Sequence, residues 1–251
     1  MRITTLLALL LGLFLAGSVA AQGLTVPPAT PAADPENTLL LDLSSGGRVA
    51  IQLRPDVAPN HVARIKELAR KGFYNGLTFH RVIDGFMAQG GDPAGDGTGG
   101  SQLPDLKAEF NGLPHVRGAI AAARQGAPEG ADAATVTAAE NSANSQFYIM
   151  LGTKLALDGH YTVFGRVISG MNFVDGLEKG EPPANPSRIL QASIASDHKA
   201  PPAPGQVFAA PAVAAGGASH SGMAAGPAVP PPPSIRIPEA KPKAPPKKKQ
   251  Q

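Results

Sequence analysis

The sequence has no cysteine and no tryptophan, and aromatic residues make up only 5% of it. Without cysteine the chain cannot form a disulfide framework, a thiol nucleophile or a thiolate metal site. Four of its six histidines show no spacing typical of metal ligands: His61, His115, His160 and His198. We therefore expect neither a metal ion nor a cofactor in this protein.

Charge and proline are spread unevenly along the 251 residues. Residues 199–251 hold 13 of the 26 prolines and seven of the 22 lysines and arginines, but only one of the 19 acidic residues. This composition predicts a disordered, extended Pro/Ala/Lys-rich tail. Such a basic tail raises non-specific affinity for anions without defining a nucleic-acid site. We expect at most weak contact with anionic envelope polymers, and no nucleic-acid partner.

Residues 1–21 have the composition of a signal peptide. Arg2 precedes a short apolar run at 6–15, and small residues allow cleavage after Ala20 or Ala21. The run is shorter than the ~20 residues that a spanning helix needs, so a cleaved peptide is favoured over a retained anchor. Residues 22–37 are rich in proline and alanine and predict a linker. We therefore expect a periplasmic or secreted protein.

Between residues 38 and 198, short apolar segments alternate with turn residues. Periodicity predicts two helices, at 59–71 and 171–177. The Ala-rich segment 125–140 has no apolar face and predicts a surface loop. About eight short strands suit an antiparallel barrel, although strand count alone does not separate a barrel from a sandwich. The predicted strands cover residues 38–43, 48–53, 79–83, 86–88, 116–123, 146–151, 162–168 and 189–195.

The segment 79–92, FHRVIDGFMAQGGD, predicts a strand, a turn at Asp84-Gly85 and a second strand. These strands bring together one fixed cation, two large apolar side chains and one amide: Arg81, Phe86, Met87 and Gln89. Such a set can bind a neutral, partly apolar group and direct a hydrogen-bond donor at it. His80 should point to the opposite face, so we assign it a structural role.

The glycine-rich loop that follows contains two partial matches to ligand-binding motifs. Glycines 95, 97 and 100 fit G-x-G-x-x-G, but Pro104 follows where a dinucleotide site needs a helix. Asp92 and Asp96 resemble the start of an EF-hand loop, but Ala94 stands where an oxygen ligand is needed. We therefore predict neither a nucleotide site nor a calcium site here.

The segment FHRVIDGFMAQGGD resembles the signature of the cyclophilins, which are peptidyl-prolyl cis/trans isomerases. NSQFYIM at 144–150 and LDGHYTVFGRV at 157–167 support this resemblance, in the family's order. The resemblance covers about residues 38 to 196. It implies that 38–198 is a mainly β domain, a closed eight-stranded antiparallel β-barrel capped by two α-helices, and a monomer. It implies that the chain accelerates X-Pro isomerisation in proline-containing polypeptides while exported proteins fold.

Two other functions stay open at this point. The barrel could bind proline-containing chains as a chaperone module with weak catalysis, or it could carry the tails to envelope polymers. The presence of both Arg81 and Gln146 favours the enzyme.

By resemblance, the catalytic residues are Arg81 and Gln146. The same resemblance assigns substrate binding to Phe86, Met87, Gln89, Ala123, Arg124, Tyr148, Leu157 and Tyr161. Four positions differ from the residues that are usual in animal cyclophilins. Arg124, Tyr148 and Tyr161 stand in place of asparagine, phenylalanine and histidine, and Ala156 replaces a tryptophan that contacts cyclosporin. The last change predicts weak binding of the drug rather than loss of catalysis.

Overall fold

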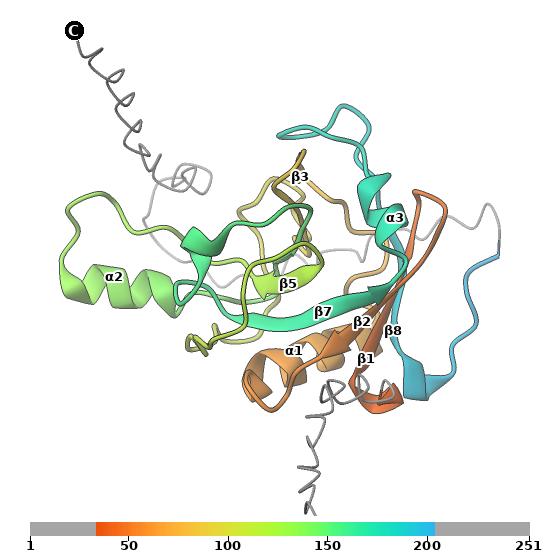
Figure 1. Cartoon of the computed structure of the whole chain (residues 1–251), viewed down its shortest axis with the longest axis horizontal. Coiled ribbons are helices and arrows are strands. Elements are labelled where there is room, and N and C mark those ends of the chain that lie inside the picture. Colours follow the sequence, from red (N-terminus) through yellow and green to blue (C-terminus); the bar gives the residue numbers. More distant parts are fainter. Residues whose placement is uncertain (1–33, 204–251) are drawn as a thin grey trace, which may run out of the picture. The chain divides into compact units, whose positions relative to one another are not determined.

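The computed structural model describes residues 34–203 (Figure 1). The predicted signal peptide, most of the predicted linker and the predicted tail beyond Ala203 lie outside the described residues. Within residues 34–203, no helix combines the length and the apolar character needed to cross a membrane.

Eight antiparallel strands form a single sheet in the order β3-β4-β6-β5-β7-β2-β1-β8. The strands are β1 (Thr38–Leu43), β2 (Gly47–Leu53), β3 (Arg81–Ile83), β4 (Met87–Gly90), β5 (Ala119–Ala122), β6 (Phe147–Met150), β7 (Val163–Ser169) and β8 (Ile189–Ile194). The helices are α1 (Pro59–Arg70), α2 (Ala133–Glu140) and α3 (Met171–Asp175), and the 3-10 turns are η1 (Pro35–Asn37), η2 (Leu155–Leu157) and η3 (Ala195–Asp197).

The first hairpin and α1 form as their sequence predicts. β1 and β2 pair in register from Thr38 with Gln52 to Leu43 with Gly47, and α1 begins with a proline in its first turn. Its N-cap, Ala58, has no side chain that can accept a hydrogen bond. Glu109 takes that role from far along the chain, because its carboxylate accepts from the first backbone N–H groups of the helix.

The sheet does not close into the barrel that the resemblance implied. β3 and β8 are its two edges, and no ladder joins them. Within residues 34–203 the gap is crossed by an isolated bridge between Thr78 and Arg188 and by backbone bonds beside it, such as Ile189 N to Leu77 O at 2.9 Å. β3 has only three residues, which is too short to build a repeating ladder with β8. The prediction of a closed barrel is therefore wrong, and the sheet is an open half-barrel.

The prediction of a surface loop at 125–140 is also wrong in part, because its second half forms α2. Alanine is the strongest helix former, and Asp132 caps the helix by accepting from Thr135 N at 2.7 Å. Only Ala139 of this helix is buried. α2 thus forms by propensity and capping without an apolar face. Together with α1 and α3, it gives the described domain three helices rather than the two expected.

Several strands are buried on both faces. Successive side chains along these strands alternate between two separate apolar clusters. Phe147 and Ile149 of β6 join the main core beneath the sheet, whereas Tyr148 and Met150 face the other side. β5 alternates in the same way, and so does β4 at Met87 and Ala88. Because side chains of a strand point alternately to opposite faces, one set of strands builds both the core and a second apolar surface.

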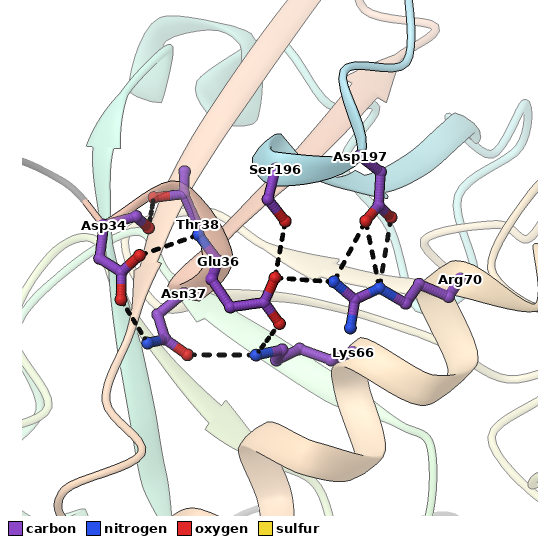
Figure 2. Close-up of polar contacts among 8 residues, drawn as sticks. All are labelled: Asp34, Glu36, Asn37, Thr38, Lys66, Arg70, Ser196 and Asp197. Atoms are coloured by element: carbon purple, nitrogen blue, oxygen red, sulfur yellow. Dashed lines mark hydrogen bonds and ion pairs between the residues drawn. The ribbon is translucent and has the colours of Figure 1, made fainter.

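A polar network ties the first and last turns of the described domain to α1 (Figure 2). Glu36 in η1 accepts from Lys66, Arg70 and Ser196, and Arg70 also pairs with Asp197 of η3 at 3.1 Å. The bonds from Arg70, then Lys66 and Ser196, lower the pKa of Glu36 to about 2. The carboxylate is therefore ionised at neutral pH.

Candidate active site

A small cleft, partly open to solvent, lies over the second apolar cluster. Eight residues line it, and they are the eight that the sequence predicted to bind substrate: Phe86, Met87, Gln89, Ala123, Arg124, Tyr148, Leu157 and Tyr161. They come from β4 and the turn before it, from β6, from the loop after β5, from η2 and from the loop before β7. The structure brings these residues together, and substrate binding by them stays a prediction.

Cross-strand pairing aligns one row of this surface. Arg81 of β3 lies opposite Gln89 of β4, Gln89 opposite Tyr148 of β6, and Tyr148 opposite Ala121 of β5. Directly paired residues of an antiparallel sheet point to the same face. A cation, an amide and an aromatic ring therefore share one side of the sheet, and Met87 lies in the next row of that face.

Tyr148 is held in place by a hydrogen bond to a buried histidine. His115 has no exposed surface; its Nε2 lies 3.1 Å from Tyr148 Oη and its Nδ1 2.8 Å from Asp158 Oδ1. Because the ionised carboxylate only accepts, Nδ1 carries the proton and Nε2 accepts the tyrosine proton. Burial lowers the pKa of His115, although Asp158 opposes this, and burial raises the pKa of Tyr148 well above its usual value. Both side chains are therefore neutral at pH 7.

The other aromatic wall is covered by an arginine. Tyr161 meets Tyr148 edge to face at 5.9 Å, and the Arg124 guanidinium lies 4.6 Å from the Tyr161 ring centre. Arg124 donates to the carbonyl oxygens of His160 and Gln125, at 3.1 and 2.8 Å. These bonds hold the cation over the ring at the rim of the cleft.

Gln146 supports the cleft from the side and is not one of the residues that line it. Its Oε1 accepts from Gln89 Nε2 at 2.9 Å, and its Nε2 donates to the carbonyl oxygens of Gly97 and Gly99. The amide thus fixes both Gln89 and the glycine-rich loop. Asp92 folds the same loop by accepting three backbone N–H bonds, so its oxygens are already engaged.

Arg81 also lies beside the lining residues and not among them. Its Nε donates to Glu181 Oε2 at 2.6 Å, in an ion pair whose arginine side chain is 17% exposed and whose glutamate is 50% exposed. Within residues 34–203, the terminal guanidinium nitrogens of Arg81 have no polar partner. His80, next to it, is buried, and its structural role stays a prediction.

Sequence reasoning missed three side chains that shape this site: His115, Asp158 and Glu181. His115 and Asp158 stand 43 residues apart, so no local pattern joins them. Asp158 belongs to the turn Leu157-Asp158-Gly159. Because Asp-Gly is a common turn sequence, it gives no sign that Asp158 also binds a histidine. Glu181 lies 100 residues from Arg81 in a proline-rich loop, and only the fold brings the two together.

Comparison with known proteins identifies the family. The family described as cyclophilin type peptidyl-prolyl cis-trans isomerase/CLD matches residues 38–194. A protein of Brucella suis biovar 1 named "Probable peptidyl-prolyl cis-trans isomerase" is 49% identical over 184 residues, which cover 67% of this chain and 87% of the relative. Peptidyl-prolyl cis-trans isomerase B of Bacillus subtilis is 40% identical over 141 residues, 55% of this chain and 89% of the relative.

Solved structures agree with this result. The cyclophilin AquaCyp293 of Hirschia baltica superposes with a TM-score of 0.57 at 29% identity, covering 66% of this chain and 76% of that one. A Cryptosporidium parvum cyclophilin type isomerase, determined in the presence of the dipeptide Ala-Pro, gives a TM-score of 0.54 at 25% identity, with coverages of 62% and 98%. The chain therefore belongs to the cyclophilin-type peptidyl-prolyl cis-trans isomerases.

Proposed function

We propose that this isomerase rotates X-Pro bonds in the cleft described above, with the proline ring held between Phe86, Met87 and Tyr148. The observation that carries this proposal is the shared face of the sheet, on which one row places a cation beside an amide and an aromatic ring. Leu157 and Tyr161 complete the apolar wall. A related isomerase determined with Ala-Pro supports a proline-containing ligand for this fold.

The chemistry requires one selective interaction. A peptide bond has partial double-bond character, and its rotation barrier is roughly 18–20 kcal/mol. In the twisted transition state the proline nitrogen regains a lone pair and accepts a hydrogen bond, which the planar amide nitrogen does not. A donor directed at that nitrogen therefore stabilises the transition state more than the ground state. Arg81 is our candidate donor, since a guanidinium presents several N–H groups in a planar fork.

The amides hold the substrate chain while the bond turns. Gln89 is almost fully buried, and its Nε2 is already bonded to Gln146, so its Oε1 is the atom that can accept a backbone N–H. Gln146 and Arg124 act at the two sides of the cleft. Gln146 fixes Gln89, and Arg124 offers its own backbone along the rim. In this scheme all groups bind or orient, and none transfers a proton.

A mutation of the pocket wall tests the location of the site. Phe86 is partly buried against the cleft cluster, so Phe86→Ala should lower kcat/KM for an X-Pro peptide about tenfold, mainly by raising KM. Ile168→Ala is the matched control, because Ile168 is 44% exposed and does not line the cleft. Equal activities of the two variants would place the reaction elsewhere.

We propose that the clients are proline-containing polypeptides folding outside the cytoplasm, served by a monomer. The signal-like composition of residues 1–21 and the basic tail of 199–251, with its weak affinity for anionic envelope polymers, support this location. Expression of the full chain in a bacterium with two membranes, followed by fractionation and N-terminal sequencing, is the test. A protein recovered in the periplasm or medium that begins at Ala21 or Gln22 is expected. An uncleaved cytoplasmic chain would refute the localisation.

A second function is favoured by one observation. Arg81 is paired with Glu181 and lies beside the cleft lining, an arrangement that also suits a module that binds proline-containing chains and catalyses weakly. Measuring binding and turnover on the same peptide separates the two. Tight binding with kcat/KM far below that of an ordinary isomerase would support the binding module.

A further inference from the structure

We propose that Glu181 is a positioning residue for Arg81, and that its carboxylate holds the guanidinium in the orientation used in catalysis. This inference rests on the proposed role of Arg81. The contact that carries it is the 2.6 Å bond from Arg81 Nε to Glu181 Oε2. Nothing in the segment 179–187 suggests a functional residue by sequence pattern, and the assignment comes from the fold.

The backbone places Glu181 opposite Arg81. Val82 and Gly180 form an antiparallel bridge, in which Val82 N donates to Gly180 O at 2.8 Å and Gly180 N to Val82 O at 2.9 Å. In an antiparallel pair the residue before one partner faces the residue after the other, so this bridge sets position 181 against position 81. The ion pair is thus built into the backbone register and does not depend on a chance encounter of two long side chains.

Gly180 makes this local fold possible. Its φ is +149°, and a β-carbon there would lie 2.5 Å from Pro183 Cα and 2.8 Å from Pro182 O. Any other residue would clash with the backbone of the loop itself, so the turn at 180–183 requires glycine here. Pro183 is buried, which anchors the loop beyond Glu181. The carboxylate is therefore held beside β3 from both directions along the chain.

The chosen nitrogen matters for the chemistry. A bond to Nε fixes the plane of the guanidinium and leaves its two terminal nitrogens for another acceptor. In the described part of the chain no other polar group holds this side chain. An arginine without the pair would have to lose its rotamer freedom in the transition state, and Glu181 removes that cost beforehand.

A double-mutant cycle on the full chain tests the proposal. Glu181→Ala should lower kcat/KM about tenfold. The loss should appear in kcat, while KM stays within about twofold of the wild-type value. Glu181→Gln should retain part of the activity, because its amide oxygen can still accept from Nε. Glu178→Ala is the matched control on the same loop, since its exposed side chain has no polar contact within residues 34–203. It should match the wild type.

The decisive comparison is made in the Arg81→Ala background. There Glu181→Ala should have no further effect, because the group that it positions is gone. An equal loss in both backgrounds, activity within twofold of wild type in Glu181→Ala, or a gain of activity would each overturn the proposal.

The Arg81 Nε–H resonance in NMR gives a readout independent of turnover. We expect it to be protected from exchange in the wild type and lost in Glu181→Ala. An unprotected resonance in the wild type would refute the pair, whereas a protected one in an inactive wild type would refute only the proposed function.

Discussion

Replacing Tyr148 by phenylalanine tests how the cleft wall is supported. The change removes only the hydroxyl that donates to His115 Nε2 at 3.1 Å. His115 is completely buried, so its nitrogen would lose its partner without gaining water. Leaving a buried polar group unpaired costs about 1–3 kcal/mol. For a domain of this size the free-energy loss corresponds to a fall in Tm of about 2–12 °C.

Activity should respond much less than stability. The aromatic ring, which forms the wall, stays in place, and its edge-to-face contact with Tyr161 needs no hydroxyl. We therefore expect kcat/KM of Tyr148→Phe to stay within about twofold of wild type. Differential scanning calorimetry and an isomerase assay on the same preparation give both quantities.

Tyr161→Phe is the matched control for this experiment. The Tyr161 hydroxyl has no hydrogen-bond partner among residues 34–203, so its removal should leave Tm within about 1 °C of wild type. If Tyr148→Phe is as stable as Tyr161→Phe, the bond to His115 contributes nothing and the argument from burial is wrong.

Three further predictions concern pH and drug binding. Burial lowers the pKa of His61, His80 and His115 below the usual 6.5, so the unfolded chain binds more protons than the folded one in this range. Stability should therefore fall as the pH drops below about 6.5. An unchanged urea midpoint from about pH 7.5 to 5.5 would contradict this. Isomerase activity of the folded enzyme should be nearly flat from about pH 5.5 to 8.5, because no group in the proposed scheme transfers a proton; a limb near pH 6.5 would implicate a histidine. Cyclosporin should inhibit weakly, and Ala156→Trp, at an exposed position of η2, should strengthen inhibition about thirtyfold; nanomolar inhibition of the wild type would refute this.

Local patterns predicted most of the elements. The hairpin of β1 and β2, the proline at the start of α1 and the turn at Asp84-Gly85 each depend on neighbouring residues, and the structure has all three. Six of the eight cleft residues lie in the three motifs, whereas Ala123 and Arg124 were assigned by the resemblance outside them. Strand alternation explains why Tyr148 reaches the cleft while Phe147 and Ile149 reach the core.

Errors arose where a long-range or a purely intrinsic effect decides. Closure of the sheet depends on whether β3 and β8 can pair, which no segment of sequence encodes by itself. α2 has no apolar periodicity, so a search for amphipathic helices does not detect it. The features that stabilise it are its alanine content and its Asp132 cap. The partners of Arg81 and Tyr148 are equally distant in sequence, and only the folded backbone selects Glu181 and His115.

The central claim is that Arg81 supplies the one interaction formed only in the twisted transition state. Its most direct test is kcat/KM of Arg81→Ala on an X-Pro peptide, with Tm measured beside it to show that the fold is intact. Removing a donor of this kind costs roughly 2.7–4 kcal/mol, so we expect a loss of about two to three decades, and poor rescue by Arg81→Lys. A folded Arg81→Ala variant that keeps more than about half of the wild-type kcat/KM would contradict the account.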